Sequence, residues 1–362
     1  MPITADDLRA AHARTAPYVR RTPLLAADPG SFGDADVSFK LELLQHAGSF
    51  KARGAFNNLV SRAIPAAGVT AASGGNHGVA VALAARRLGH AATIFVPEIS
   101  SPVKVAAIRA QGAEVVIGGA RYADAQAACD RHARESGALL VHPFDAEATI
   151  AGAGSLAIEW EEDRARFGLA PLDTVLIAVG GGGLIAGVAA WWRGRVKIVG
   201  VEPEGSRCLH AALEAGHPVD VTVESVAADS LGARRVGELA FGIAREAVER
   251  VVLVDDDAIR AAQGALWTGY RIAAEPGGAT ALAALAAGAY QPTKGERVGV
   301  LVCGGNVELG SLAEITARQA ARTCCERSSD PCERSPSRVG SESFDARASA
   351  SSRPSSQAPA HS

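Results

Sequence analysis

Short apolar runs alternate along this chain with longer segments whose apolar residues recur at helical spacing. Apolar runs that stop at Pro or Gly, as at 91–97 and 174–179, predict buried strands, and the pattern at 37–43 and 138–142 predicts further strands. Segments such as 79–88, 102–111 and 124–136, the last followed by Gly137, predict helices. Strands that alternate with helices build parallel sheets covered by helices, and ligands bind where the strands end. The pattern therefore predicts an α/β protein with mostly parallel sheets.

Composition narrows the class of protein further. The 362 residues are enough for two domains, each with its own core. A net charge of -3 and a pI near 6.3 give no electrostatic reason to expect a nucleic-acid partner. No apolar run approaches the length of a membrane span, and the start of the chain has no basic region followed by an apolar stretch. We therefore expect a cytoplasmic protein with no membrane or nucleic-acid partner.

The last part of the chain differs from the rest. Residues 323–362 are rich in Ser, Arg, Pro and Glu, with almost no apolar residue after Val339. Such a segment cannot bury enough apolar surface to offset its ordering entropy, so we expect it to be disordered. The six cysteines form neither a disulfide framework nor a metal-finger spacing.

Three glycine-containing loops follow strand-like runs and carry candidate chemistry. Glycines let main-chain amides approach a ligand, and a helix that follows adds partial positive charge. The loop at 73–78 suits a carboxylate or a phosphate, although a tight turn with a capping Asn is equally compatible. Four consecutive glycines at 180–183 favour a phosphate over a flexible turn. The loop at 303–306 opens with Cys303, for which an inert core thiol and a reactive thiolate both remain open.

One lysine has unusual neighbours. Lys51 precedes an expected helix at 52–60, and the residues beside it are small or apolar. A desolvated amine with a lowered pKa is the condition for Schiff-base chemistry. A lysine at a helix start is more commonly just solvated, so the residues alone leave both interpretations open.

In this order and spacing, the pieces resemble the serine/threonine dehydratases (threonine ammonia-lyases) among the fold-type II pyridoxal-phosphate enzymes. The similarity runs from about residue 15 to about residue 317. The motifs that carry it are Ser49-Phe50-Lys51-Ala52-Arg53-Gly54-Ala55, Ser73-Gly74-Gly75-Asn76-His77, Gly180 to Gly183 with Leu184, Glu202-Pro203, Ala228-Asp229-Ser230-Leu231, Glu275-Pro276-Gly277-Gly278-Ala279 and Cys303-Gly304-Gly305-Asn306.

The resemblance implies a role for each position. Lys51 is the implied catalytic residue, which binds pyridoxal 5'-phosphate as a Schiff base and moves protons at the substrate Cα. The implied cofactor-binding residues are Phe50, Lys51, Asn76, Gly180, Gly181, Gly182, Gly183, Leu184, Glu275 and Cys303, the last at the pyridine nitrogen. The implied substrate-carboxylate loop consists of Ser73, Gly74, Gly75, Asn76 and His77.

The resemblance also implies an architecture of two open, twisted, mostly parallel sheets, like that of tryptophan synthase β. A large cofactor-binding domain would comprise 1–67 and 146–322, and a small mobile domain at 68–145 would close over the substrate. We expect a homodimer or homotetramer. After residue 317 we expect no regulatory domain.

The implied reaction removes the β-hydroxyl of L-threonine or L-serine and yields 2-oxobutanoate or pyruvate plus ammonia. Gly74 stands where serine racemases of this family have a second serine, so racemisation is not expected. The family's divalent-cation site has one acid at the position of Glu202 and another at the position of Cys208, so the site is incomplete here and we predict no metal. The alternatives are a dehydratase or β-replacing enzyme for another β-substituted amino acid and a non-catalytic binding protein. A nucleotide-binding oxidoreductase lacks the spaced glycines it would need.

Overall fold

The structure is a computed structural model that describes residues 3–100 and 102–317. Within these residues the strands form a six-stranded sheet and a four-stranded sheet. The prediction of disorder for 323–362 lies outside the described residues. No helix in the described part of the chain is long and apolar enough to cross a membrane.

The larger sheet has the strand order β1-β3-β11-β8-β9-β10. Its strands are β1 (Leu24–Ala26), β3 (Asp36–Lys40), β11 (Arg297–Leu301), β8 (Thr174–Ala178), β9 (Lys197–Pro203) and β10 (Arg250–Val254). Only the β1–β3 pair is antiparallel, and every other pair is parallel. The carboxyl ends of β3, β8 and β11 therefore meet at one edge of this sheet, which is where ligands bind in such folds.

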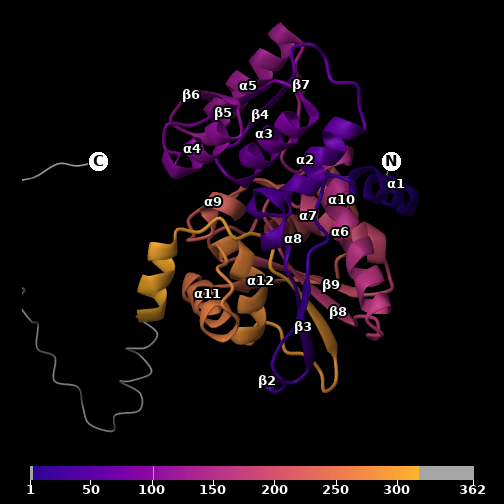
Figure 1. Ribbon diagram of the computed structural model, residues 1–362. Coiled ribbons are helices and arrows are strands. Elements are labelled where there is room, and N and C mark those ends of the chain that lie inside the picture. The colour runs from indigo at the N-terminus through magenta and orange to yellow at the C-terminus, as the bar shows by residue number, and fades with distance from the viewer. Residues whose placement is uncertain (1–2, 101, 318–362) are drawn as a thin grey trace, which may run out of the picture. The chain divides into compact units, whose positions relative to one another are not determined.

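The smaller sheet has the order β6-β5-β4-β7, and its pairs are all parallel. Its strands are β4 (Val69–Ala72), β5 (Ala92–Val96), β6 (Glu114–Ile117) and β7 (Leu139–Leu140). Figure 1 shows α3, α4 and α5 grouped around this sheet. The expectation of an α/β fold with mostly parallel sheets is confirmed.

Helices cover both sheets. They are α1 (Ala5–Thr15), α2 (Lys51–Val60), α3 (Asn76–Leu88), α4 (Pro102–Ala110), α5 (Tyr122–Ser136), α6 (Glu147–Arg166), α7 (Gly183–Trp192), α8 (Cys208–Ala215), α9 (Ala228–Leu231), α10 (Glu238–Ala247), α11 (Asp256–Tyr270) and α12 (Pro276–Ala286). Shorter elements are the strand β2 (Ser31–Asp34) and the 3-10 turns η1 (Glu42–Leu44) and η2 (His46–Gly48).

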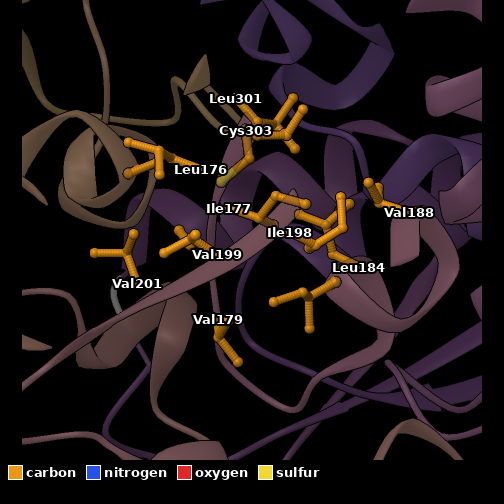
Figure 2. Packing of buried hydrophobic residues seen from close by; sticks show 14 of the residues in the cluster. Leu176, Ile177, Val179, Leu184, Val188, Ile198, Val199, Val201, Leu301 and Cys303 are labelled. Atoms are coloured by element: carbon orange, nitrogen blue, oxygen red, sulfur yellow. The ribbon is translucent and has the colours of Figure 1, made fainter. Parts of the chain in front are cut away.

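The core of the larger sheet is built from its central strands. Leu176 of β8 and Val199 of β9 are buried together with Leu184 and Val188 of α7 (Figure 2). Strands that are covered by helices on both faces need apolar side chains at nearly every position, which explains the continuous apolar runs in the sequence.

The helix that carries Lys51 packs toward both sheets. Ala52, Phe56 and Leu59 of α2 belong to the same buried cluster as Val69 and Ile94 of the smaller sheet. The helix also contacts α6, which covers the larger sheet. The expected division into 1–67 with 146–322 and 68–145 thus places α2 in one domain while part of its apolar face lies in the core of the other. That division stays a prediction.

Two expected boundaries differ by three residues in the structure. The strand expected at 37–43 ends at Lys40, because Leu41 leaves the extended region (φ -95, ψ 65) and η1 follows. The helix expected from residue 79 begins at Asn76, with Gly75 as its cap. The earlier start brings the helix N-terminus, with its free N–H groups, into the loop at 73–78.

Candidate active site

Four loops from distant parts of the sequence meet at the carboxyl edge of the larger sheet. Ser49 forms a β-bridge with Gly304, and the Phe50 N–H donates to the Cys303 carbonyl at 3.1 Å. Asn76, at the start of α3, reaches Glu275, the cap of α12. These contacts bring four segments together around one centre. They are the loop before Lys51, the loop at 73–78, the segment after β11 and the start of α12.

The Lys51 amine lies inside this centre. Its Nζ donates to the Pro143 carbonyl at 2.8 Å and lies 5.0 Å from the centroid of the Phe50 ring. Burial lowers the pKa of Lys51 to about 8, although the nearby Cys303 and Glu275 act in the opposite direction. Near neutral pH a useful fraction of this amine is therefore unprotonated, as a nucleophile or a base must be.

The glycine loop between β8 and α7 offers main-chain N–H groups as hydrogen-bond donors for a ligand. None of the main-chain N–H groups from Gly180 to Leu184 has an acceptor among the described residues. Gly182 has a φ of +88°, a left-handed conformation that glycine adopts without strain. A Cβ on Gly181 would overlap the ring of Phe144, so no side chain fits there. Convergent free N–H groups at a helix N-terminus are suited to an anion such as phosphate.

Asn76 and Glu275 form a short polar contact. Asn76 Nδ2 donates to Glu275 Oε1 at 2.6 Å. Burial raises the pKa of Glu275 to about 7, against the opposing effects of the Asn76 hydrogen bond and the charges of Lys104 and Lys51. The Glu275 carboxyl can therefore change protonation near neutral pH while it remains next to Asn76.

Cys303 is a protonated thiol in this environment. Its Sγ donates to the Gly277 carbonyl at 3.4 Å. Burial, followed by the charge of Glu275, raises the pKa of Cys303 to about 12. A thiol with such a pKa is not a nucleophile at neutral pH, so the reactive-thiolate interpretation loses its support.

The loop at 73–78 is folded tightly on itself. Ser73 Oγ accepts from the Gly75 N–H at 3.2 Å. A Cβ on Gly74 would overlap Ser100 Oγ, so the Ser100 hydroxyl fills the space that a side chain at position 74 would occupy.

His77 points away from this loop. Its Nε2 lies 2.8 Å from the Val141 carbonyl, which requires the proton on Nε2. Burial, together with the charge of Lys51, lowers the pKa of His77 to about 3. The ring is therefore neutral, and any contact of His77 with a ligand of the loop would use its main-chain N–H.

The segment after β7 belongs to the site but was not expected from the sequence. Pro143 provides the carbonyl for Lys51, and the Phe144 ring packs against Gly181. The Asp145 carboxylate accepts from the N–H groups of Glu238 and Leu239, both at 3.0 Å, and so caps α10. The available signal was a Pro-Phe-Asp sequence directly after an expected strand, at the edge where ligands bind.

The residues considered for a cation form a different arrangement. The Glu202 carboxylate accepts from the N–H groups of Leu209 at 2.9 Å and His210 at 2.8 Å, at the start of α8. Cys208 Sγ donates to the Gly180 carbonyl at 3.2 Å. In the part of the chain that the structure describes, no cluster of three or more His, Cys, Asp or Glu side chains could hold a metal ion.

The donor set fits pyridoxal phosphate. The free N–H groups from Gly180 to Leu184 suit its phosphate, the Lys51 amine suits its aldehyde, and the Cys303 thiol can contact its ring nitrogen without a charge. The chain belongs to the pyridoxal-phosphate dependent enzymes, whose family model matches residues 15–304. The expected cofactor and the fold-type II, tryptophan synthase β-like class are confirmed.

Relatives within this family carry several names. Phenylserine dehydratase from Ralstonia pickettii is 41% identical over 322 residues, which cover 86% of this chain and 96% of that protein. A biosynthetic L-threonine dehydratase from Salmonella typhimurium is 38% identical over 291 residues, but the chain spans only 56% of its length. The solved structure of maize serine racemase matches with a TM-score of 0.81 at 32% identity, covering 90% of this chain and 100% of that one. Because the names include dehydratases and a racemase, the reaction has to be argued from the site.

Proposed function

We propose that the protein is a lyase that removes the β-hydroxyl group and the amino group from an L-β-hydroxy amino acid, giving a 2-oxo acid and ammonia. The observation that carries the proposal is the position of the Lys51 amine. The amine is buried, its pKa is lowered, and it donates to the carbonyl of Pro143, which precedes the Phe144 ring packed against Gly181 of the glycine loop. The names of the two dehydratase relatives support the same reaction class.

Each group has a defined task in this proposal. When bound, pyridoxal phosphate supplies an electron sink for the charge that develops at the substrate Cα. The N–H groups from Gly180 to Leu184 hold the phosphate. The N–H groups of Gly74, Asn76 and His77, which have no acceptor among the described residues, hold the substrate carboxylate, whereas those of Ser73 and Gly75 already donate to Phe95 and to Ser73 Oγ. The Lys51 amine accepts the proton from the substrate Cα, for which a pKa of about 8 is well matched near neutral pH.

The Cys303 thiol limits how far negative charge at the substrate Cα can be stabilised. An uncharged thiol beside the ring nitrogen cannot stabilise a protonated ring as a carboxylate would. Charge at Cα is then short-lived, which favours departure of the β-hydroxyl with or soon after removal of the proton by Lys51. The same chemistry disfavours reactions that need a long-lived carbanion.

We propose L-threonine and L-serine as substrates, with L-threo-3-phenylserine as a second candidate. The second candidate is favoured by the phenylserine dehydratase, whose identity extends over 96% of its own length. Racemisation is the less suited reaction, because Gly74 has no side chain to exchange a proton on the face opposite Lys51. The Ser100 hydroxyl occupies that space, so Ser100→Ala is the variant to examine if D-serine is formed.

A substrate panel tests this function. Purified protein loaded with pyridoxal phosphate is incubated with L-threonine, L-serine and L-threo-3-phenylserine, and ammonia, 2-oxo acid and D-isomer are measured separately. The proposal expects equal amounts of ammonia and 2-oxo acid from at least one of the three. Absence of 2-oxo acid from all three, or a D-isomer as the sole product, would contradict it.

We also propose that the protein works as a homodimer or homotetramer, with 68–145 closing over the substrate. Sedimentation equilibrium of the loaded protein checks the first point, because a monomer at micromolar concentration would exclude it.

A further inference from the structure

Asn306 has no task in the reaction proposed above, yet its side chain connects two parts of the site. Its Nδ2 donates to the Ala47 carbonyl at 2.8 Å and to Asn76 Oδ1 at 2.7 Å. Asn76 in turn donates from Nδ2 to Glu275 Oε1. A chain of hydrogen bonds thus runs from the main chain before Lys51, through two amides, to a buried carboxyl.

The direction of this chain is fixed at its Ala47 end. A main-chain carbonyl such as that of Ala47 can only accept, so the atom of Asn306 that faces it must be the amide nitrogen. That nitrogen then requires an acceptor on Asn76, which is Oδ1. With Oδ1 occupied, Asn76 presents its nitrogen to Glu275, whose carboxylate is also an acceptor. The orientation of the Asn76 amide therefore follows from the Ala47 carbonyl.

The backbone around Ala47 is shaped to present this carbonyl. Ala47 has a φ of +62°, one of two non-glycine residues with a positive φ among the described residues. Such a conformation is disfavoured for an L-residue and persists where surrounding contacts enforce it. Gly48 follows with a φ of +71°, and the Gly305 N–H donates to its carbonyl at 2.9 Å. The loops at 45–49 and 303–306 therefore hold Asn306 in place together.

We propose that Asn306 is a positioning residue that sets the orientation of the Asn76 amide toward the cofactor. One N–H of Asn76 Nδ2 is used by Glu275, and the second is left for an acceptor on the ring of the cofactor. Without the Asn306 donor, Glu275 alone would orient the Asn76 amide, and a protonated Glu275 would allow the amide to flip and present its oxygen there. The inference rests on the proposed function and on the cofactor-binding role that the family resemblance implies for Asn76.

Two substitutions distinguish positioning of the Asn76 amide by Asn306 from simple support of the loop at 303–306. Asn306→Ala removes the Nδ2 donor that holds Asn76 Oδ1 in its orientation. Asn306→Asp replaces the donor by an acceptor, which repels Asn76 Oδ1 and favours the flipped amide. If Asn306 only supports the loop, Asn306→Ala should raise the Kd for pyridoxal phosphate at least as much as Asn306→Asp. If Asn306 positions Asn76, Asn306→Asp should raise the Kd more.

The test is titration of the apoprotein with pyridoxal phosphate, followed by a pH titration of the visible absorption band of the bound cofactor. We expect Asn306→Ala to raise the Kd about tenfold, the effect of one lost hydrogen bond, and Asn306→Asp to raise it further. We also expect Asn306→Asp to shift the pH midpoint of the band. Wild-type Kd and midpoint in both variants would overturn the inference.

Asn76→Ala distinguishes failure of the inference from failure of the site assignment. If Asn76→Ala raises the Kd and Asn306→Asp does not, the assignment of Asn76 stands and the positioning role is wrong. If Asn76→Ala leaves the Kd unchanged, the assignment is wrong and the positioning role is rejected with it.

A pair of glycine substitutions provides an independent test. A Cβ on Gly48 would overlap Asn306 Oδ1, whereas a Cβ on Gly89, at the end of α3, meets nothing within 4 Å. The two glycines have similar φ angles of +71° and +76°, so alanine introduces similar backbone strain at both. We expect only Gly48→Ala to raise the Kd for pyridoxal phosphate. Equal Kd values for the two variants would contradict the role of Asn306.

Discussion

At the scale of single residues, environment decides which side chains can react. The chain has five lysines, and Lys51 is the one whose amine lies between the Phe50 ring, Glu275 and Cys303. Burial lowers the pKa of its amine, while the same burial raises the pKa of the Cys303 thiol. Desolvation thus makes the lysine a better nucleophile and the cysteine a worse one.

The lowered pKa of Lys51 predicts a pH dependence for cofactor attachment. The amine must be unprotonated to attack the aldehyde, and it loses its proton as the pH rises through about 8 rather than 10.5. The rate at which the apoprotein captures pyridoxal phosphate should therefore rise between pH 6 and pH 8 and level off near pH 9. Stopped-flow absorbance measures this rate, and N-acetyl-lysine under the same conditions corrects for titration of the cofactor itself. A protein rate that follows the N-acetyl-lysine curve toward pH 10 would contradict the lowered pKa.

The sequence reveals some of the site residues but not the contacts between them. Lys51 could be singled out because its neighbours in the sequence are small or apolar. The pairing of Asn76 with Glu275 could not, because it depends on how two loops 199 positions apart are folded together. The two interpretations of Cys303 were separated only by its burial beside Glu275, which the sequence does not encode locally.

At the scale of elements, the turn from β8 into α7 is the part most dependent on glycine. Its N–H groups have no acceptor among the described residues, and Phe144 packs directly against Gly181. A larger residue would have to displace either the ring or the loop.

Gly181→Ala should weaken cofactor binding. The added Cβ overlaps the Phe144 ring, and overpacking of about 1–3 kcal/mol corresponds to a Kd increase of about ten- to hundredfold. Titration of the apoprotein with pyridoxal phosphate measures this change. Gly242→Ala in α10 is the matched control, because nothing lies within 4 Å of its Cβ and alanine favours a helix by about 1 kcal/mol. An unchanged Kd for Gly181→Ala would show that this loop does not hold the phosphate.

Element positions followed largely from the hydrophobic pattern. The strands at 174–178 and 92–96 were expected because buried parallel strands are continuous apolar runs bounded by Gly or Pro. The start of α3 was expected three residues too late, since Asn76 and His77 are polar and resemble loop residues. Their helical conformation depends on burial of His77 and on the contact between Asn76 and Glu275.

At the scale of the whole molecule, buried charges connect the helix of Lys51 to the larger sheet. Arg53 of α2 is paired with Glu42 at 2.7 Å and with Glu159 of α6 at 2.9 Å. Lys40 of β3 is paired with the same Glu159 at 2.7 Å. All four side chains are at most 3% exposed, so each charge depends on its partners.

Removal of Glu159 should therefore destabilise the protein strongly. Glu159→Ala leaves Lys40 and Arg53 with a missing partner in the interior, a change that costs about 3–5 kcal/mol. Urea-induced unfolding measures the loss in free energy of unfolding. Glu161→Ala, two residues along α6, removes a pair with Arg195 in which both side chains are 40% or more exposed and a hydrogen bond from Trp191 Nε1 at 2.7 Å, and should cost about 1–2 kcal/mol. Similar losses for the two variants would contradict the importance of the buried network.

The architecture could be predicted from the alternation of strands and helices, and the family from its motifs. The buried network could not, because hydrophobic patterning places charged residues on the surface. The limits of the domains were equally inaccessible, since α2 shares apolar residues with the smaller sheet while Arg53 is paired on the side of the larger one. A helix that contributes to the packing of two sheets has no distinct pattern in the sequence.

The central claim, that the cofactor is held at Lys51, is tested most directly by locating the covalent attachment. The loaded protein is reduced with borohydride and digested, and the modified peptide is identified by mass spectrometry. With five lysines at positions 40, 51, 104, 197 and 294, the assignment is unambiguous. The account predicts a stoichiometric label on Lys51 and its loss in Lys51→Ala. A label on Lys104 or any other lysine, or a stoichiometric label in Lys51→Ala, would contradict it.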